Sequence, residues 1–147
     1  MMEYTFYTPK DNVSEDTKKE IADFLYEHLD QFGDKHEYIM KCINFALDEE
    51  DKFGGFILTS REDGKINGAV IINKTGMGGY IPENILVYIA VDKAYRGKGI
   101  GKALMQKTFD KAEGDIKLHV EPENPARYLY EKLGFTSKYL EMRWTRK

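Results

Sequence analysis

The chain has 147 residues, of which 41% are hydrophobic and 32% are charged. This length suits one hydrophobic core and is too short for two ordinary domains, so we expect a single domain over residues 1–147. The formal net charge of -3 argues against a nucleic-acid-binding face, because such faces concentrate lysine and arginine. No stretch approaches the apolar length of a membrane span, and no basic segment with a following apolar run opens the chain. We therefore expect a cytoplasmic protein that binds neither nucleic acid nor membrane.

Hydrophobic periodicity and turn signals divide the first half of the chain into a strand, two helices and a hairpin. Ser14, followed by two acidic residues, is typical of a helix N-terminus. Asp63-Gly64 is a strong turn signal between two apolar segments, which predicts a β-hairpin. The predicted ranges are 3–8 for the strand, 14–31 and 34–48 for the helices, and 56–59 and 66–73 for the hairpin strands.

Two residues with reactive side chains lie on apolar helical faces. Cys42 is the only cysteine, so it can form neither an internal disulfide nor a thiolate metal cluster. It shares a helical face with Ile39 and Ile43, which favours a packing role over a catalytic one. His28 lies on the apolar stripe of the first predicted helix, which favours a core histidine.

The second half of the chain alternates strands and helices around one glycine-rich turn. Its first apolar run lacks polar alternation, as expected of a central strand that is covered on both faces. Glycines end both helices, and an Asn-Pro pair begins the second one. The predicted ranges are 85–91, 116–120 and 135–144 for strands, with helices that end at Gly114 and run from Asn124 to Gly134. The order β-α-α-β-β-β-α-β-α-β predicts an α/β (α+β) fold, with a mixed central sheet and helices on both faces.

The glycine-rich turn joins the central strand directly to the next helix and has the composition of an anion-binding seat. Three glycines remove side chains that would keep a phosphate away from the main chain. Three cationic side chains add donors, and the helix start adds unpaired N–H groups and a partial positive charge. We therefore expect a diphosphate to bind here. The residues of the seat are Arg96, Gly97, Lys98, Gly99, Ile100, Gly101 and Lys102.

Two common phosphate-binding loops do not fit this turn. The loop G-x-x-x-x-G-K-[ST] needs one more residue between its glycines, and Ala103 stands where that loop needs a magnesium-binding hydroxyl. The dinucleotide fingerprint G-x-G-x-x-G needs a different glycine spacing and a place near the start of a βαβ unit. The turn therefore predicts neither NTP hydrolysis nor dinucleotide binding.

The turn instead fits the pattern [RQ]-x-x-G-x-[GA], which begins at Arg96 and ends at Gly101. A second block follows at 124–135, with the sequence NPARYLYEKLGF. On these two blocks the chain resembles the GNAT superfamily of acyl-CoA-dependent N-acetyltransferases, whose fold has the predicted arrangement of strands and helices. The resemblance is specific over 84–135 and only architectural before that.

The resemblance implies a role for each part of these blocks. In the family the central strand splays from the next strand, so that its main chain pairs with the pantetheine arm and the thioester oxygen of CoA. Tyr130 takes the place of the general acid that protonates the departing thiolate. The main-chain role falls to Ile89, Ala90 and Val91, pyrophosphate binding to residues 96–102, and contacts with the rest of CoA to Asn124 and Lys132.

The general base and the acceptor site have several candidates. Glu83 precedes the central strand, where many relatives carry a carboxylate that accepts the amine proton, but an ordinary exposed loop residue also fits this position. Tyr88 and His119 are alternatives on neighbouring strands. The glycine-rich connection 74–82 and the acidic run 48–51 are candidates for shaping the acceptor site, while a slack hairpin and a solvated charge run are their structural alternatives.

We therefore predict an N-acetyltransferase that moves the acetyl group of acetyl-CoA, its acyl-donor cosubstrate, to a primary amine by direct transfer in a ternary complex. The alternative is a non-catalytic acyl-CoA-binding regulatory domain, against which the retention of Tyr130 argues. An enzyme that transfers longer acyl groups or succinyl groups would differ only in the pocket beyond the thioester. The acceptor stays open among a polyamine, an amino acid, an aminoglycoside-like amine and a peptide N-terminus. No metal is expected, and the oligomeric state stays open, with a homodimer as one alternative.

Overall fold

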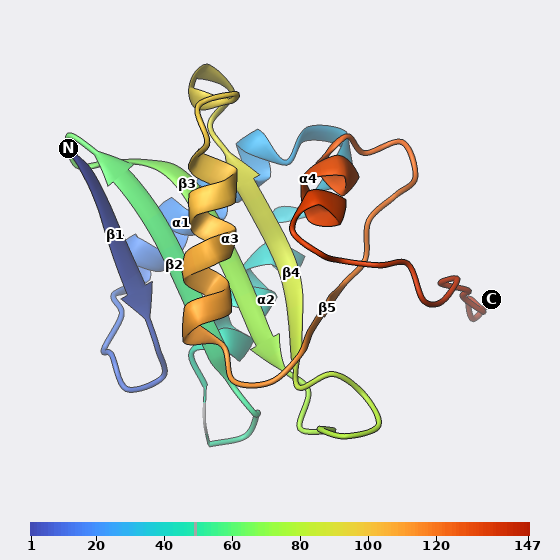
Figure 1. Cartoon of the computed structure of the whole chain (residues 1–147). Coiled ribbons are helices and arrows are strands. Elements are labelled where there is room, and N and C mark those ends of the chain that lie inside the picture. The colour runs from blue at the N-terminus through green and yellow to red at the C-terminus, as the bar shows by residue number, and fades with distance from the viewer. Residues whose placement is uncertain (49) are drawn as a thin grey trace.

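The computed structural model describes residues 1–48 and 50–147. A five-stranded sheet with the order β1-β2-β3-β4-β5 forms its centre (Figure 1). Neighbouring strands from β1 to β4 are antiparallel, and β4 and β5 are parallel, so the sheet is mixed as predicted. The strands are β1 (Met2–Tyr7), β2 (Gly55–Glu62), β3 (Lys65–Lys74), β4 (Asn84–Val91) and β5 (Ile116–Leu118).

Helices cover both faces of this sheet (Figure 1). On one face Ala69 and Ile71 of β3 pack under the first two helices, and on the other Val70 and Ile72 pack under the third. Successive residues of one strand point to opposite faces, so β3 contributes to both apolar clusters. Among the described residues, no helix has the length and apolar character needed to span a bilayer. The helices are α1 (Glu15–His28), α2 (His36–Ala46), α3 (Ile100–Lys111) and α4 (Ala126–Lys132), with 3-10 turns η1 (Asp30–Phe32) and η2 (Lys93–Tyr95).

Local sequence signals explain several of these boundaries. The Ser14 Oγ accepts a hydrogen bond from Thr17 N–H at 3.1 Å, so Ser14 caps α1 as predicted. Asp63 and Gly64 have φ angles of 53° and 78°, which suit the type I′ turn of a two-residue hairpin between β2 and β3. Cys42 is buried where α2 meets the sheet, and its predicted packing position is confirmed.

The parallel strands β4 and β5 run side by side for three residues and then part. Their pairing ends at Leu86 and Leu118, whereas β4 continues to Val91. A bulge lies at the same point, because β3 pairs with Leu86 and Tyr88 and leaves Val87 between them without a partner in that ladder. Beyond the bulge, the described chain gives β4 no strand neighbour on its β5 side. We call this side of β4 the open edge.

The fold class is the one predicted from the sequence, but the predicted final strand over 135–144 is wrong. Residues 133–147 contain no helix or strand, and the C-terminal segment extends away from the sheet (Figure 1). Its alternating apolar side chains Leu140, Met142 and Trp144 are exposed. Alternation does not by itself make a strand, because backbone groups need a paired neighbour and the edge strand β5 offers only three residues. The observed order is therefore β-α-α-β-β-β-α-β-α.

The first two helices are shorter than predicted. α1 ends at His28 rather than near Gln31, because Asp30 adopts a left-handed φ of 54° that a helix cannot continue through. α2 begins at His36, so the predicted helix start at Asp34 is wrong. Asp34 instead lies in the connection between η1 and α2, where its side chain is not held on a helical face.

Candidate active site

The glycine-rich turn between β4 and α3 lines a hollow of about 240 Å³. Gly97 and Gly99 have left-handed φ angles of 79° and 84°, and a Cβ on either would meet nothing within 4 Å. The first N–H group that bonds within α3 is that of Ala103, which donates to Gly99 O at 3.0 Å. The N–H groups of residues 100–102 therefore have no partner inside the helix. A turn with these donors at a helix start suits a phosphate group.

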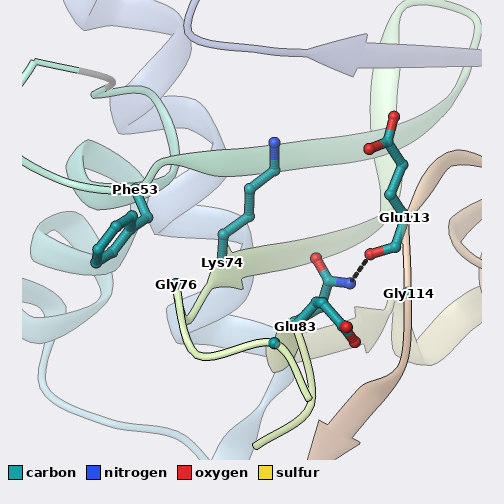
Figure 2. A pocket seen from close by; sticks show the side chains of 8 residues that line it. Phe53, Lys74, Gly76, Glu83, Glu113 and Gly114 are labelled. Carbon is teal, nitrogen blue, oxygen red and sulfur yellow. Dashed lines mark hydrogen bonds between the residues drawn. The ribbon is translucent and has the colours of Figure 1, made fainter.

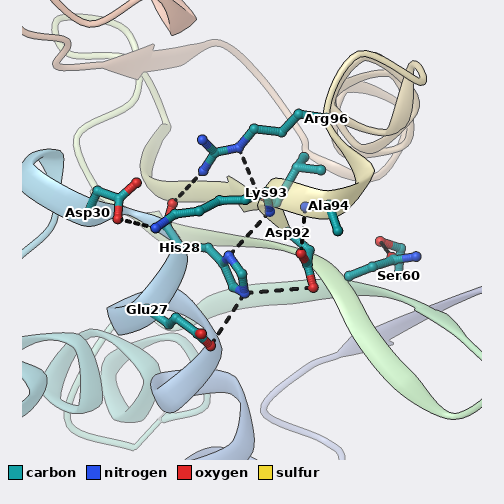
Figure 3. A network of polar contacts seen from close by, with 10 residues as sticks. Glu27, His28, Asp30, Ser60, Asp92, Lys93, Ala94 and Arg96 are labelled. Carbon is teal, nitrogen blue, oxygen red and sulfur yellow. Dashed lines mark hydrogen bonds and ion pairs between the residues drawn. The ribbon is translucent and has the colours of Figure 1, made fainter.

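Of the three cationic side chains of the turn, two are exposed lysines and one is an arginine that is hydrogen-bonded to the main chain. Lys98 and Lys102 are exposed, and the Lys98 Nζ lies 5.3 Å from the centre of the Tyr95 ring. Arg96 is tied to the body of the protein (Figure 3): its Nε donates to Val91 O at 3.1 Å and its Nη2 to His28 O at 2.8 Å. These two bonds join the end of β4, the turn and the end of α1. The sequence did not reveal this structural task, and pyrophosphate binding by Arg96 stays a prediction.

His28 lies at the centre of the same polar network (Figure 3). Its side chain is 9% exposed, and its ring lies 4.7 Å from that of Phe24 between centroids. Its Nδ1 accepts Lys93 N–H at 3.4 Å, and its Nε2 lies 3.8 Å from Asp92 Oδ2. The His28 side chain is largely buried, but His28 is partly exposed as a residue and is not part of the apolar cluster, so the prediction of a core histidine holds only in part. Its polar contacts connect α1 to the residues after β4.

The open edge of β4 presents main-chain groups beside the hollow. Asp92 N–H donates to Asn67 O at 2.8 Å, which sets the alternation of the antiparallel β3–β4 ladder. By that alternation, Ala90 turns its N–H and C=O toward β3, whereas Ile89 and Val91 turn theirs toward the open edge. Of the three residues predicted to bind pantetheine through the main chain, two face the right way. Ala90 contributes its small side chain to the α1/α2 face instead.

Tyr130 reaches this region from α4. It is 7% exposed, and its ring packs edge-on against Phe135 with 5.8 Å between centroids. It belongs to the apolar cluster that includes Leu86, the last β4 residue before the bulge. Burial raises the pKa of Tyr130 to about 12, so the phenol stays protonated at neutral pH. A neutral phenol in an apolar cluster beside the open edge can donate a proton.

The two other residues predicted to contact CoA lie at the ends of α4. Asn124 Oδ1 accepts Ala126 N–H at 2.9 Å and so stabilises the first turn of the helix. Lys132 is exposed in the last turn. Their contacts with CoA stay predictions.

A larger hollow, of about 400 Å³, lies at the opposite end of β4 (Figure 2). Glu83 lines it, together with Phe53 and Lys74. The Glu83 Oε1 accepts Asp115 N–H at 2.8 Å, and this bond holds the pKa of Glu83 below its ordinary value. The lowered pKa makes Glu83 a weaker proton acceptor than an ordinary glutamate.

Glu83 also lies away from the open edge. Val87 lies four positions further along the chain, roughly 13 Å away at 3.3 Å per residue. Over this stretch β4 is paired with β5, and Asn84 Nδ2 donates to Glu113 O at 2.8 Å (Figure 2). Glu83 thus helps to fasten the start of β4 to the turn before β5. Its role as general base stays a prediction, with this structural task as the alternative.

The two segments predicted to shape the acceptor site have contacts of other kinds. Lys74, Gly76 and Gly78 of the connection 74–82 line the larger hollow. The acidic run 48–51 includes Glu49, which lies outside the described residues. Asp48 Oδ1 accepts the N–H of the second residue after it at 2.9 Å, as expected where a helix ends in a turn. Binding of an amine by either segment stays a prediction.

A contact that the sequence did not reveal joins Tyr88 to Asp34. The Tyr88 hydroxyl donates to Asp34 Oδ2 at 2.6 Å, across 54 positions of sequence. Tyr88 is the first residue after the bulge in β4. The other alternative base, His119, is exposed just after β5 ends. No local signal predicts such a contact, because it depends on the register of the sheet and on the path of the η1–α2 connection.

Comparisons with known proteins agree with this geometry. A family model described as an acetyltransferase (GNAT) domain matches residues 53–137, more than half of the chain. No curated protein matches the chain significantly.

Solved structures with a similar fold cover the chain almost completely. A ribosomal-protein-alanine N-acetyltransferase from Brucella melitensis biovar Abortus 2308 has 22% identity and a TM-score of 0.69, with 99% of each chain covered. A GNAT-family acetyltransferase from Streptococcus pneumoniae TIGR4 has 16% identity and a TM-score of 0.69, with 100% of this chain and 99% of that chain covered. A transcriptional regulator from Bacillus halodurans C-125 has 15% identity and a TM-score of 0.71, covering 98% and 100%. The match to the family model, on a chain with this fold, shows that the protein belongs to the GNAT acetyltransferase family.

Proposed function

We propose that this GNAT acetyltransferase transfers the acetyl group of acetyl-CoA to a primary amine of a small molecule or peptide, directly within a ternary complex. The observation that carries the proposal is that three features adjoin at one end of β4. They are the main-chain groups of Ile89 and Val91 on the open edge, the N–H groups at the start of α3, and helix α4, whose Leu129 lines the hollow and whose Tyr130 belongs to the apolar cluster of this face.

The residues of this region fit the chemistry of the proposed acyl donor. A diphosphate needs several N–H donors and positive charge, which the start of α3 and the exposed Lys98 and Lys102 supply. The amide groups of pantetheine can pair with a strand that lacks a neighbour, and Ile89 and Val91 present such groups. The Arg96 Nε already occupies one acceptor, Val91 O, so the N–H and C=O of Ile89 and the N–H of Val91 are the groups we assign to pantetheine.

Tyr130 supplies the proton that the departing sulfur needs. When the C–N bond forms and the C–S bond breaks, the sulfur takes the electron pair, and a neutral phenol can protonate it. An ammonium nitrogen loses two protons during the reaction and the sulfur gains one, so one proton is released overall. The high pKa of the buried Tyr130 ensures that its proton is present before transfer.

The environment of the Tyr130 hydroxyl favours an enzyme over a non-catalytic acyl-CoA-binding domain. The hydroxyl bonds to no described residue, yet it is not among the fully enclosed polar atoms that lack a partner, so a bound ligand can reach it. The likeness to a transcriptional regulator has 15% identity and bears on the fold alone. We therefore assign Tyr130 a chemical task.

Free-thiol release tests the proposal. The protein is mixed with acetyl-CoA and, in turn, with spermidine, L-lysine, kanamycin and a short peptide with a free N-terminus, and the acetylated product is identified by mass spectrometry. We expect thiol release that depends on one of these amine classes and exceeds the rate without amine. Acetyl-CoA binding without amine-dependent release from any of them would contradict the proposal and favour a regulatory domain.

A further inference from the structure

The two buried tyrosines near the bulge lie on opposite faces of the sheet. Tyr130 belongs to the apolar cluster on the α3 face, together with Leu86. Tyr88, two residues after Leu86 and directly after the bulge, belongs to the cluster on the α1/α2 face. Pairing of β4 with β5 ends at Leu86, so Tyr88 is on the open edge, while Tyr130 packs in the cluster of the opposite face. Tyr130 is on the side of the proposed acyl donor, which leaves Tyr88 on the side from which an acceptor can approach.

Tyr88 is bonded to a carboxylate that faces solvent. Tyr88 is 8% exposed and donates its hydroxyl proton to Asp34 Oδ2 at 2.6 Å. Asp34 is exposed in the connection between η1 and α2, and no other described residue hydrogen-bonds to its carboxylate. Burial and the Asp34 carboxylate together raise the pKa of Tyr88 well above its ordinary value. Tyr88 by itself is therefore a poor base, and it can accept a proton only if it passes its own to Asp34.

Among the described residues, the further titratable groups that act on this pair are Cys42 and Arg143. Burial raises the pKa of the Cys42 thiol to about 12, so it stays neutral. Asn73 of β3 donates to Cys42 Sγ at 3.4 Å. From the C-terminal segment, the pKa of Arg143 is raised by Glu141 and, less strongly, by Asp34, which places its guanidinium within electrostatic range of the pair. Asp34 is the only carboxylate among the described residues that bonds to Tyr88.

We propose that Tyr88 and Asp34 form the proton-accepting relay for the acceptor amine. The ammonium group of the acceptor gives a proton to the Tyr88 oxygen as the Tyr88 proton moves to Asp34 Oδ2. The resulting neutral amine attacks the thioester carbon, the C–N bond forms, and the C–S bond breaks as Tyr130 gives its proton to the sulfur. The second proton of the nitrogen then goes, through solvent, to the Tyr130 oxygen and restores the neutral phenol. Asp34 then releases its proton to solvent, which accounts for the one proton that the reaction sets free. This inference rests on the proposed function and replaces Glu83, which lies beyond the paired segment of β4, as the base.

The test uses the full-length protein, acetyl-CoA and the amine of the panel that gives the fastest thiol release. Asp34→Asn and Tyr88→Phe each interrupt the relay while keeping the shape of the side chain. Asp110→Asn and Tyr26→Phe are matched controls, because both residues are exposed on helices and bond to no described side chain. Glu83→Gln tests the rival base directly. Thermal melting and acetyl-CoA affinity show whether each variant folds and binds the donor.

We expect kcat/KM for the amine near pH 7 to fall by roughly 10²–10⁴ in Asp34→Asn and in Tyr88→Phe, with acetyl-CoA affinity nearly unchanged. In the double variant Asp34→Asn/Tyr88→Phe, kcat/KM lies no more than a few-fold below that of either single variant, because both changes break the same relay. The difference in kcat/KM between the variants and the parent becomes smaller as the pH approaches the pKa of the amine, because more of the amine is then already neutral when it binds. Asp34→Glu restores part of the activity, the two controls stay within a few-fold of the parent, and Glu83→Gln loses less activity than Asp34→Asn.

Three results would overturn the relay. One is an Asp34→Asn variant whose kcat/KM stays within a few-fold of the parent. Another is a deficit that does not narrow with pH, because that marks a purely structural loss. The third is a larger loss in Glu83→Gln than in Asp34→Asn. If the parent protein binds acetyl-CoA but releases no thiol with any amine, the proposed function itself fails, and the relay fails with it.

Discussion

Replacing Arg96 with alanine removes the two hydrogen bonds that hold the glycine-rich turn to Val91 and His28. A bond from a charged donor contributes about 1.5–3 kcal/mol when it is buried, and water competes for the exposed guanidinium, so we expect a total loss of about 1–3 kcal/mol. For a domain of this size that corresponds to a fall in melting temperature of roughly 2–12 °C. The loss appears in the absence of any ligand, because both acceptors belong to the protein. An arginine that served only to bind phosphate would give no such loss.

Urea and thermal unfolding of the ligand-free protein measure this effect, with Lys102→Ala as the matched control. Lys102 is an exposed cation on the same turn, and no described residue pairs with its side chain. We expect Lys102→Ala to change the free energy of unfolding by less than about 0.5 kcal/mol. Equal stability of the parent and Arg96→Ala, without ligand, would refute the structural task that we assign to Arg96.

Three further measurements test the proposed acid, the anion seat and the C-terminal segment. Tyr130→Phe should lower turnover by roughly 10²–10⁴ with little change in acetyl-CoA affinity, and an equal loss in the exposed neighbour Tyr128→Phe would argue against a specific acid. Acetyl-CoA should raise the melting temperature of the parent but not that of Gly101→Glu, because the new carboxylate would fill the anion seat and repel the phosphate. Gly101→Ala is the control: its Cβ would meet Leu129 at 3.3 Å, and it should keep part of the shift in melting temperature. Trp144, the only tryptophan, is 77% exposed and should show the emission and quenching of a solvated indole, and a strongly blue-shifted emission would contradict the extended C-terminal segment.

The parts of the fold that were predictable from the sequence are those with local signals. Ser14 caps a helix through its own hydroxyl, and Asp63-Gly64 accepts the positive φ angles of a tight turn, so both boundaries can be derived from neighbouring residues alone. The glycine-rich turn was also predictable from neighbouring residues, because its glycines and the helix that follows them are contiguous in the sequence. The central strand 85–91 was predictable because it is apolar without alternation, and it appears as β4 with one residue more.

The parts that were not predictable depend on distant neighbours. The alternating segment that contains Leu140 and Trp144 has the pattern of a strand, yet β5 is too short to pair with it. Glu83 precedes the central strand as predicted, but β4 leaves β5 only after Leu86, three residues further along, and this point is set by where β5 ends. The contact of Tyr88 with Asp34 requires both the bulge, which sets the face of Tyr88, and the late start of α2, which leaves Asp34 outside a helix.

The most direct test of the central claim is to locate bound acetyl-CoA on the protein by following backbone amide NMR signals during a titration. We expect the largest shifts on Ile89, Val91 and residues 97–102, and nearly unchanged signals from the larger hollow around Glu83 and Gly114. Shifts centred on Glu83 and Gly114, with the turn unaffected, would contradict the assignment of the donor site to the open edge of β4 and the start of α3.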